Sequence, residues 1–141
     1  MANPAPLRLL AEDPEDLGVI SAALQDAVGK VGDIVYEPKA RRLTIALNRF
    51  RWEGEARQRV RSALQLGGVG KVQARKVRRD RPDAVIELLA VTFEAGEAPA
   101  GVITFQLAGG GDLRAEVECI DAILADLSDP WPTPRTPQHE A

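Results

Sequence analysis

The sequence predicts an α+β domain: a mainly antiparallel sheet or partly closed barrel of about seven strands, with two inserted helices and a C-terminal amphipathic helix. Three observations predict this fold. Residues 102–119 alternate apolar and polar side chains on either side of a glycine-rich turn at 109–112, as in a hairpin with one wet face. In 120–127 the apolar residues recur at i, i+3, i+4 and i+7, which is typical of an amphipathic helix. Short connections between the apolar runs favour antiparallel pairing.

Two further helices are predicted upstream. Asp13 is a suitable N-cap and Pro14 a suitable first residue for the earlier one. Gly29 is its expected terminator. Its apolar stripe consists of Leu17, Ile20, Leu24 and Val28. The second helix is expected over about 55–66, where arginines fall largely on one face and apolar residues on the other.

Strands are expected at 7–10, 34–37, 42–50, 69–77, 85–93, 102–107 and 113–119. The segment 69–77 is rich in Lys and Arg, which suits an edge strand. The segment 85–93 is apolar on both faces and predicts a central strand covered on both sides. Seven strands followed by a closing helix resemble the pleckstrin-homology-like barrel, although helices after the first and third strands are not part of its basic pattern.

Length and composition predict one globular domain over 1–128 and a disordered, proline-rich tail over 129–141. A chain of 141 residues has the usual size of a single domain, and 45% hydrophobic with 28% charged residues is an ordinary globular composition. No apolar run approaches the roughly 20 residues needed to cross a bilayer, and the N-terminus lacks a signal-peptide pattern. We therefore expect a cytoplasmic protein without membrane contact.

Charge is strongly segregated along the chain. From Lys39 to Pro82 there are 14 Lys or Arg and three acids, a net +11, while the remainder holds four bases and 18 acids, a net −14. Together these give the −3 of the whole chain. Opposed charges of this kind favour docking to a partner or to another copy. The pI of 5.2 argues against general nucleic-acid binding, for which basic domains are usual.

No catalytic constellation is visible, so we expect neither an enzyme nor a cofactor. The one histidine, His139, falls in the expected tail, which excludes an ordinary triad or zinc site. Cys119 alternates with core residues and is expected to be buried and inert. Glu116, Glu118 and Asp121 form an acidic cluster that can in principle contribute to a divalent-cation site, but a solvated face is the better interpretation. The glycines at 109–111 join two strands, so a hairpin turn is favoured over a phosphate loop.

The basic centre is the strongest candidate for binding. Arg49 and Arg51 flank Phe50 near a strand end, and arginines beside aromatic residues can hold phosphate and stack on bases. The candidate surface for an anion or a partner comprises Arg49, Arg51, Trp52, Lys71, Arg75 and Arg78. The alternative interpretation is that these charges only solubilise strand and helix surfaces, with Phe50 and Trp52 packed in the core.

Four segments together are similar to a known family: 47–53, 81–85, 93–99, and 108–112 leading into 117–120. They resemble a family of small, uncharacterised bacterial proteins known only as a domain of unknown function. The resemblance extends from about Leu7 to Trp131. It implies a bacterial, cytoplasmic, stand-alone domain and supplies no activity or catalytic residue.

Three hypotheses of function follow. The first is a non-enzymatic interaction domain that binds a protein partner or forms a homo-oligomer. The second is binding of RNA or another polyanion through the basic segment 39–82, which predicts strong salt dependence. The third is a metal-dependent enzyme using the acidic cluster, and it is the least favoured.

Overall fold

The structure, a computed structural model, describes residues 5–134 and 136–137 and consists mainly of one open antiparallel sheet. Within these residues the strands are β1 (Arg8–Ala11), β2 (Val28–Lys30), β3 (Ile34–Glu37), β4 (Arg42–Phe50), β5 (Gln58–Leu66), β6 (Val69–Arg75), β7 (Val85–Ala95), β8 (Gly101–Leu107), β9 (Asp112–Val117), β10 (Ala122–Asp126) and β11 (Trp131–Pro132). One α-helix, α1 (Pro14–Ala23), and one 3-10 turn, Val31–Asp33, complete the described elements.

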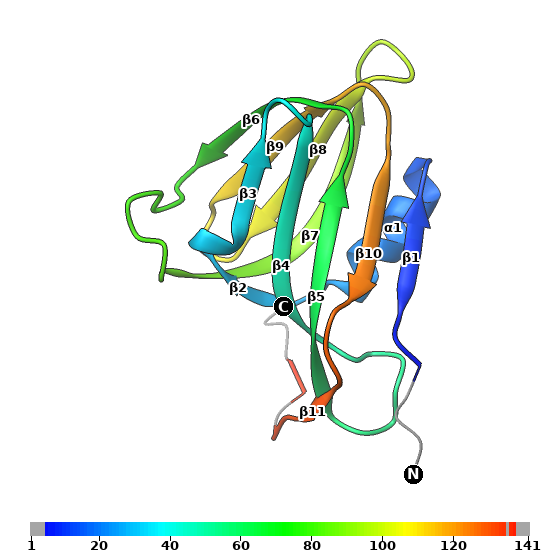
Figure 1. Cartoon of the computed structure of the whole chain (residues 1–141), viewed down its shortest axis with the longest axis vertical. Helices are drawn as coiled ribbons and strands as arrows, with labels where there is room; N and C mark the ends of the chain where they lie inside the picture. The colour runs from blue at the N-terminus through cyan, green and yellow to red at the C-terminus, as the bar shows by residue number, and fades with distance from the viewer. Residues whose placement is uncertain (1–4, 135, 138–141) are drawn as a thin grey trace.

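The strands follow one another in the order β1-β10-β5-β4-β2-β7-β8-β9-β6. β3 pairs with β4 on the same side as β2, and β11 pairs with β5 on the same side as β10. Figure 1 shows the sheet curled, with β3, β4 and β5 in front of β7, β8 and β9. The sheet does not close into a barrel, because β3 and β6 do not pair. The expected antiparallel sheet is therefore confirmed, and barrel closure was wrong.

Elements with clear local patterns form as predicted. Asp13 caps α1, because its Oδ1 accepts the backbone N–H of Asp16 at 2.8 Å. The hairpins 34–50 and 101–117 are both present, and β7 lies centrally between β2 and β8. The expected coverage of β7 on both sides was wrong, because Val85 is 69% and Leu89 37% exposed. At the second hairpin, Gly109 and Gly110 have φ of 88° and 91°, values that favour glycine. α1 ends at Ala23, earlier than expected, and Val28 begins β2 instead.

The helix predicted over 55–66 is wrong, because this segment contains strand β5. Val60, Ser62, Leu64 and Leu66 are all buried, which is a period of two. Ser62 occupies one of these inward positions, and its polarity interrupted the apolar alternation in the sequence. Its hydroxyl is satisfied inside, where it donates to Asp126 at 2.7 Å.

The helix predicted over 120–127 is also wrong, because it contains strand β10. β10 lies between β1 and β5, with Leu124 opposite Leu9 on one side and opposite Leu64 on the other. Leu124 is fully buried whereas Leu127 is 62% exposed, so the helical stripe does not exist. Without a C-terminal helix, the likeness to a pleckstrin-homology-like barrel fails too.

The core fills the space inside the curled sheet, and α1 covers β7 with Leu17 and Ile20. Phe105 from β8 is among the largest fully buried side chains. Within the described residues, no helix has the length and apolar character needed to cross a membrane. The tail was expected to be disordered from residue 129. Its first part instead forms a strand, because Trp131–Pro132 pairs with β5 as β11. Positions 135 and 138–141, His139 included, lie outside the described residues.

Candidate functional site

An apolar groove of about 380 Å³ lies where the sheet stays open, between β3 and β6. Its walls come from the 3-10 turn and β3 on one side and from β6 and the following loop on the other. The lining residues are Val31, Gly32, Ile34, Tyr36, Val72, Ala74, Val77, Arg79, Pro82 and Leu113. Groove residues far apart in sequence are brought together by the curl of the sheet (Figure 1).

The floor of the groove is the uncovered side of the core. Five partly buried apolar residues that pack on the core also line the groove: Val31, Ile34, Tyr36, Val72 and Val77. Beneath them Leu113 is only 3% exposed. Small apolar ligands or side chains entering the groove would therefore extend an existing core rather than meet a separate surface patch.

The two walls are tied together at one end. The Tyr36 hydroxyl donates to the Val69 carbonyl at 3.0 Å, and the Val69 N–H donates to the Arg41 carbonyl at 2.9 Å. Just beyond Val69 the pairing of β6 with β9 shifts before resuming at Lys71. From Lys71 to Arg75, β6 pairs with β9 alone, so within the described residues its other edge has no strand partner.

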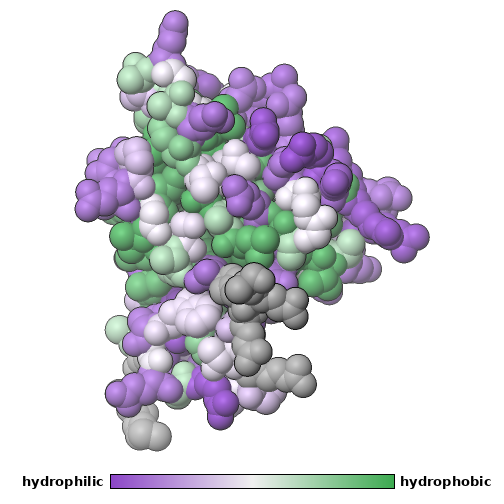
Figure 2. Space-filling model, turned by 180° about the vertical axis from the view of Figure 1, so that it is seen from behind, coloured by the Kyte–Doolittle hydropathy of each residue, from purple (hydrophilic) through white to green (hydrophobic). Residues whose placement is uncertain are grey.

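Positive charge surrounds this edge. In the part of the chain that the structure describes, five exposed bases of β6 and the following loop form no ion pair: Lys71, Lys76, Arg78, Arg79 and Arg81. Arg75, in contrast, donates to Asp112 at 2.7 Å. In Figure 1, β6 and its loop project to the left. Figure 2 shows the molecule from behind, so the same side lies to the right, where hydrophilic side chains gather. The groove is therefore apolar inside and cationic at its rim.

The structure divides the six residues predicted to form one binding surface. Lys71, Arg75 and Arg78 belong to β6 and its loop, beside the groove. The other three lie at the end of β4 and in the turn after it, and form a different environment. The expectation of a single surface is therefore not met.

Arg49 lies in the interior with its side chain fully buried, so its expected exposure was wrong. Its five N–H groups are all used: Nε and Nη2 donate to Asp126, Nη1 and Nη2 donate to Glu53, and Nη1 also donates to the Phe50 carbonyl. The carboxylate bonds are 2.8–2.9 Å long. A guanidinium paired twice in this way has no donor left for a ligand.

We call Arg49, Glu53, Ser62 and Asp126 the buried network. Asp126 also accepts the Leu7 N–H at 2.8 Å, so the network joins the start of β1 to β4, β5 and β10. Its centre is a structural ion pair, because the Arg49 and Asp126 side chains compensate each other away from water, while Glu53, with its side chain 40% exposed, pairs with Arg49 from the surface.

Arg51 and Trp52 also make internal contacts. Arg51 is buried and donates to Gln58 Oε1, with its Nε 3.7 Å from Glu53. Trp52 is 38% exposed, donates its indole N–H to the Gln25 carbonyl at 3.2 Å, and packs edge-on against Phe50 with ring centroids 4.7 Å apart. These contacts match the alternative interpretation for Phe50, which is 5% exposed, but not for Trp52, which stays at the surface.

The buried network shifts the pKa of both carboxylates downward. Hydrogen bonds from Arg49 are the main cause of the lowered pKa of Glu53, and burial opposes them. Burial by itself would raise the pKa of Asp126, but the hydrogen bonds from Arg49, Ser62 and the Leu7 N–H outweigh it and lower the pKa. The pKa of Arg49 is raised because its bonds to both carboxylates outweigh its desolvation.

These shifts predict acid sensitivity. Each lowered pKa contributes stability that is present above the ordinary values, 4.5 for Glu53 and 3.8 for Asp126, and that is lost as pH falls through the lower folded values. We expect the urea-unfolding midpoint to fall below pH 4.5, chiefly through Asp126, whose side chain is nearly inaccessible to water. Asp126→Asn should be less stable at pH 7 and show a shallower acid slope. Parallel slopes for both proteins would contradict this role of Asp126.

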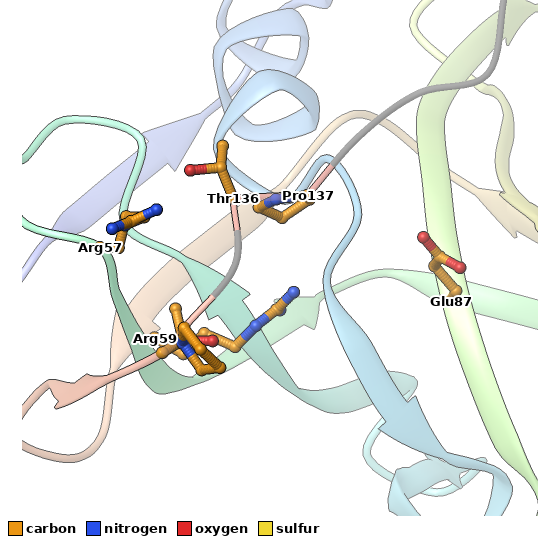
Figure 3. Close-up of a pocket in the computed structure, with 7 residues that line it drawn as sticks. Arg57, Arg59, Glu87, Thr136 and Pro137 are labelled. Atoms are coloured by element: carbon orange, nitrogen blue, oxygen red, sulfur yellow. The ribbon is translucent and has the colours of Figure 1, made fainter.

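A larger hollow, of about 710 Å³, lies between β5, β7 and the C-terminal segment. Figure 3 shows Arg57 and Arg59 on one side, Glu87 on the other, and Thr136 and Pro137 of the C-terminal segment between them. Arg59 is engaged, because it donates to the Asn48 carbonyl at 3.0 Å, and burial lowers its pKa. With Glu87 opposing the arginines, the hollow offers an anion no uniform charge, so we favour the groove as the functional site.

The acidic cluster does not assemble into a metal site. In residues 5–134 and 136–137, no three His, Cys, Asp or Glu side chains come together to hold a metal ion. Glu118 instead forms an ion pair with Arg41. Cys119 is exposed, so its expected burial was wrong, because β9 ends at Val117 and the chain turns before β10.

Sequence reasoning missed the groove. Its members Ile34, Tyr36 and Val72 have the alternation of core-facing residues, and the pattern is correct in that they pack on the core. Alternation specifies the face on which a side chain lies, but it does not show whether a further strand covers that face. The one useful indication was that 69–77 reads as an edge strand while keeping an apolar side.

Within the described residues, the fold and the groove define a class: an open antiparallel β-sheet domain with one short helix and an apolar groove along its unclosed side. Residues 7–139 match the model of a family described as a protein of unknown function (DUF2948), and the chain belongs to this family. The match confirms the resemblance noted in the sequence. No curated protein and no solved structure gives a significant match.

Proposed function

We propose that this protein is a non-enzymatic interaction domain that binds a segment of a partner protein in the groove between β3 and β6. One observation supports the proposal: within the described residues, the groove is an uncovered side of the core that lies beside an unpaired strand edge. Peptide-binding domains commonly combine these two features, because the edge supplies main-chain hydrogen bonds and the apolar depressions select side chains.

The proposal requires binding to depend on the groove floor. A displayed library of random peptides, selected on the full chain, should yield ligands that Val72→Asn binds about tenfold more weakly, because a buried valine contributes about 1.5 kcal/mol or more. The matched control is Val85→Asn, which makes the same change at a residue that is 69% exposed and outside the groove. Affinities would be measured by calorimetry and folding by thermal melting.

If Val72→Asn does not fold, Ala74→Gln would replace it in the same binding measurement. Ala74 lines the groove but is exposed, so this change disturbs the core less. Selection of no ligand, or of ligands that bind the groove variant and the native chain equally, would refute the proposed function.

A polyanion such as RNA is the second candidate, favoured by the five exposed bases of β6 and its loop that form no ion pair with any described residue. Arg49 and Arg51 no longer support it, since both are buried. A polyanion would contact the arginines and lysines without needing the apolar floor. Its binding would therefore survive Val72→Asn, which separates the two candidates.

A further inference from the structure

The nature of the partner segment can be inferred further, and this step rests on the proposed function. We propose that the groove takes an acidic, extended segment of another protein, in which acidic and apolar residues alternate, and that this segment pairs with the free edge of β6.

The free edge determines the backbone conformation of the ligand. Among the residues that the structure describes, Lys71 to Arg75 pairs with β9 on one side only, so the N–H and C=O groups that point the other way are available to a further strand. Such groups are satisfied most completely by an extended chain. The segment from Lys71 to Arg75 is long enough for a short added strand.

The two faces of β6 determine the order of side chains in the ligand. Val72 and Ala74 lie opposite the buried Ala115 and Leu113, so they face the groove. Lys71, Gln73 and Arg75 alternate with them and face outward. An added strand alternates in the same way, so every second residue points into the groove and is best apolar. The residues between them lie beside Lys71, which forms no ion pair within the described residues, and beside Arg75, which already pairs with Asp112, so acidic residues are best matched to Lys71.

Charge selects the partner and argues against self-pairing. Two copies joined antiparallel through β6, centred on Gln73, would place Lys71 of each opposite Arg75 of the other. Like charges directly opposite one another destabilise a strand pair. An acidic segment would be attracted to the charges that repel a second copy. It would also lie near bases of the loop after β6, such as Arg79, which lines the groove.

Synthetic peptides test the inference with the full chain. The main probe is a soluble peptide in which Glu and Val alternate over about ten residues, long enough to pair along all of β6. Four comparison probes differ in one property each: the same composition in Glu-Glu-Val-Val blocks, Lys in place of Glu, and two alternating peptides N-methylated on the Glu amides or on the Val amides. An oligouridine of similar length represents polyanions.

The alternating peptide should bind at least tenfold more tightly than the block and Lys peptides. One N-methylated peptide should lose binding and the other keep it, because the amides of a strand point alternately to its two edges. Lys71→Gln/Arg79→Gln should weaken binding about tenfold and reduce its salt dependence. The control Arg8→Gln/Arg57→Gln changes two exposed arginines away from the groove and should leave binding unchanged. Amide chemical-shift changes should centre on 71–75.

Several results would overturn the inference: no binding at about 1 mM peptide, equal affinity for the alternating and block peptides, or binding insensitive to Lys71→Gln/Arg79→Gln. Binding of oligouridine without the alternating peptide would assign the bases to a polyanion instead. If the displayed library yields groove ligands that lack acidic residues, this inference fails while the proposed function stands.

Discussion

Replacing Arg49 with methionine is expected to lower the free energy of unfolding by about 3–5 kcal/mol, the usual effect of breaking a buried ion pair. The methionine removes five hydrogen bonds and leaves Asp126, 3% exposed, as a buried carboxylate without its guanidinium. Urea unfolding followed by circular dichroism would measure the loss. Because the buried network joins β1, β4, β5 and β10, we expect the whole sheet to lose stability cooperatively.

Two variants make this result interpretable. Arg57→Met changes an exposed arginine and should stay within about 0.5 kcal/mol of the native chain. Arg49→Lys keeps the charge but cannot pair in a planar, bidentate way with two carboxylates, so it should restore only part of the loss. A loss below about 1 kcal/mol for Arg49→Met would mean that the buried network contributes no more than a surface ion pair.

Leu124→Ala is expected to destabilise the chain by about 2–5 kcal/mol, while Leu127→Ala should change stability by less than about 0.5 kcal/mol. Leu124 is fully buried between β1 and β5, and Leu127 is 62% exposed just beyond β10. The same chemical change is made three residues apart. The pair therefore compares the strand with the helix that the sequence predicts, since a helical stripe would bury both leucines.

Thermal and urea unfolding of the two variants would provide this comparison. Similar losses for both would support a helix and contradict strand β10. A negligible loss for Leu124→Ala alone would mean that the centre of the sheet is loosely packed, contrary to the burial of Leu64 opposite it.

The two failed helix predictions share one physical cause. Alternation in β5 and β10 is interrupted at Ser62 and Asp126, both at inward positions, and the remaining apolar residues happen to fit a helical period. These two polar groups can lie inside only because each bonds to the other and Asp126 pairs with Arg49, which comes from β4. Local pattern cannot reveal a partner 77 residues away. The same contact removed Arg49 from the expected binding surface.

The sequence by itself determined the elements whose causes are local. Asp13 caps its helix through a neighbour three residues away, and Gly109 and Gly110 make the hairpin turn. Apolar alternation specifies β8 and β9 throughout and β4 as far as Leu47. It also determined that the strand expected over 69–77, which forms over 69–75 as β6, is an edge strand, because charged residues there discourage other pairing.

Only the tertiary structure decided which inward faces are covered and which charges are neutralised. The apolar sides of β3 and β6 look like ordinary core faces in the sequence, but the sheet curls without closing and leaves a groove between them. Arg49 and Lys71 look like similar surface bases, yet one is enclosed by carboxylates and the other stays exposed beside the free edge. Burial and charge pairing depend on contacts between distant segments, and those contacts exist only after the chain has folded.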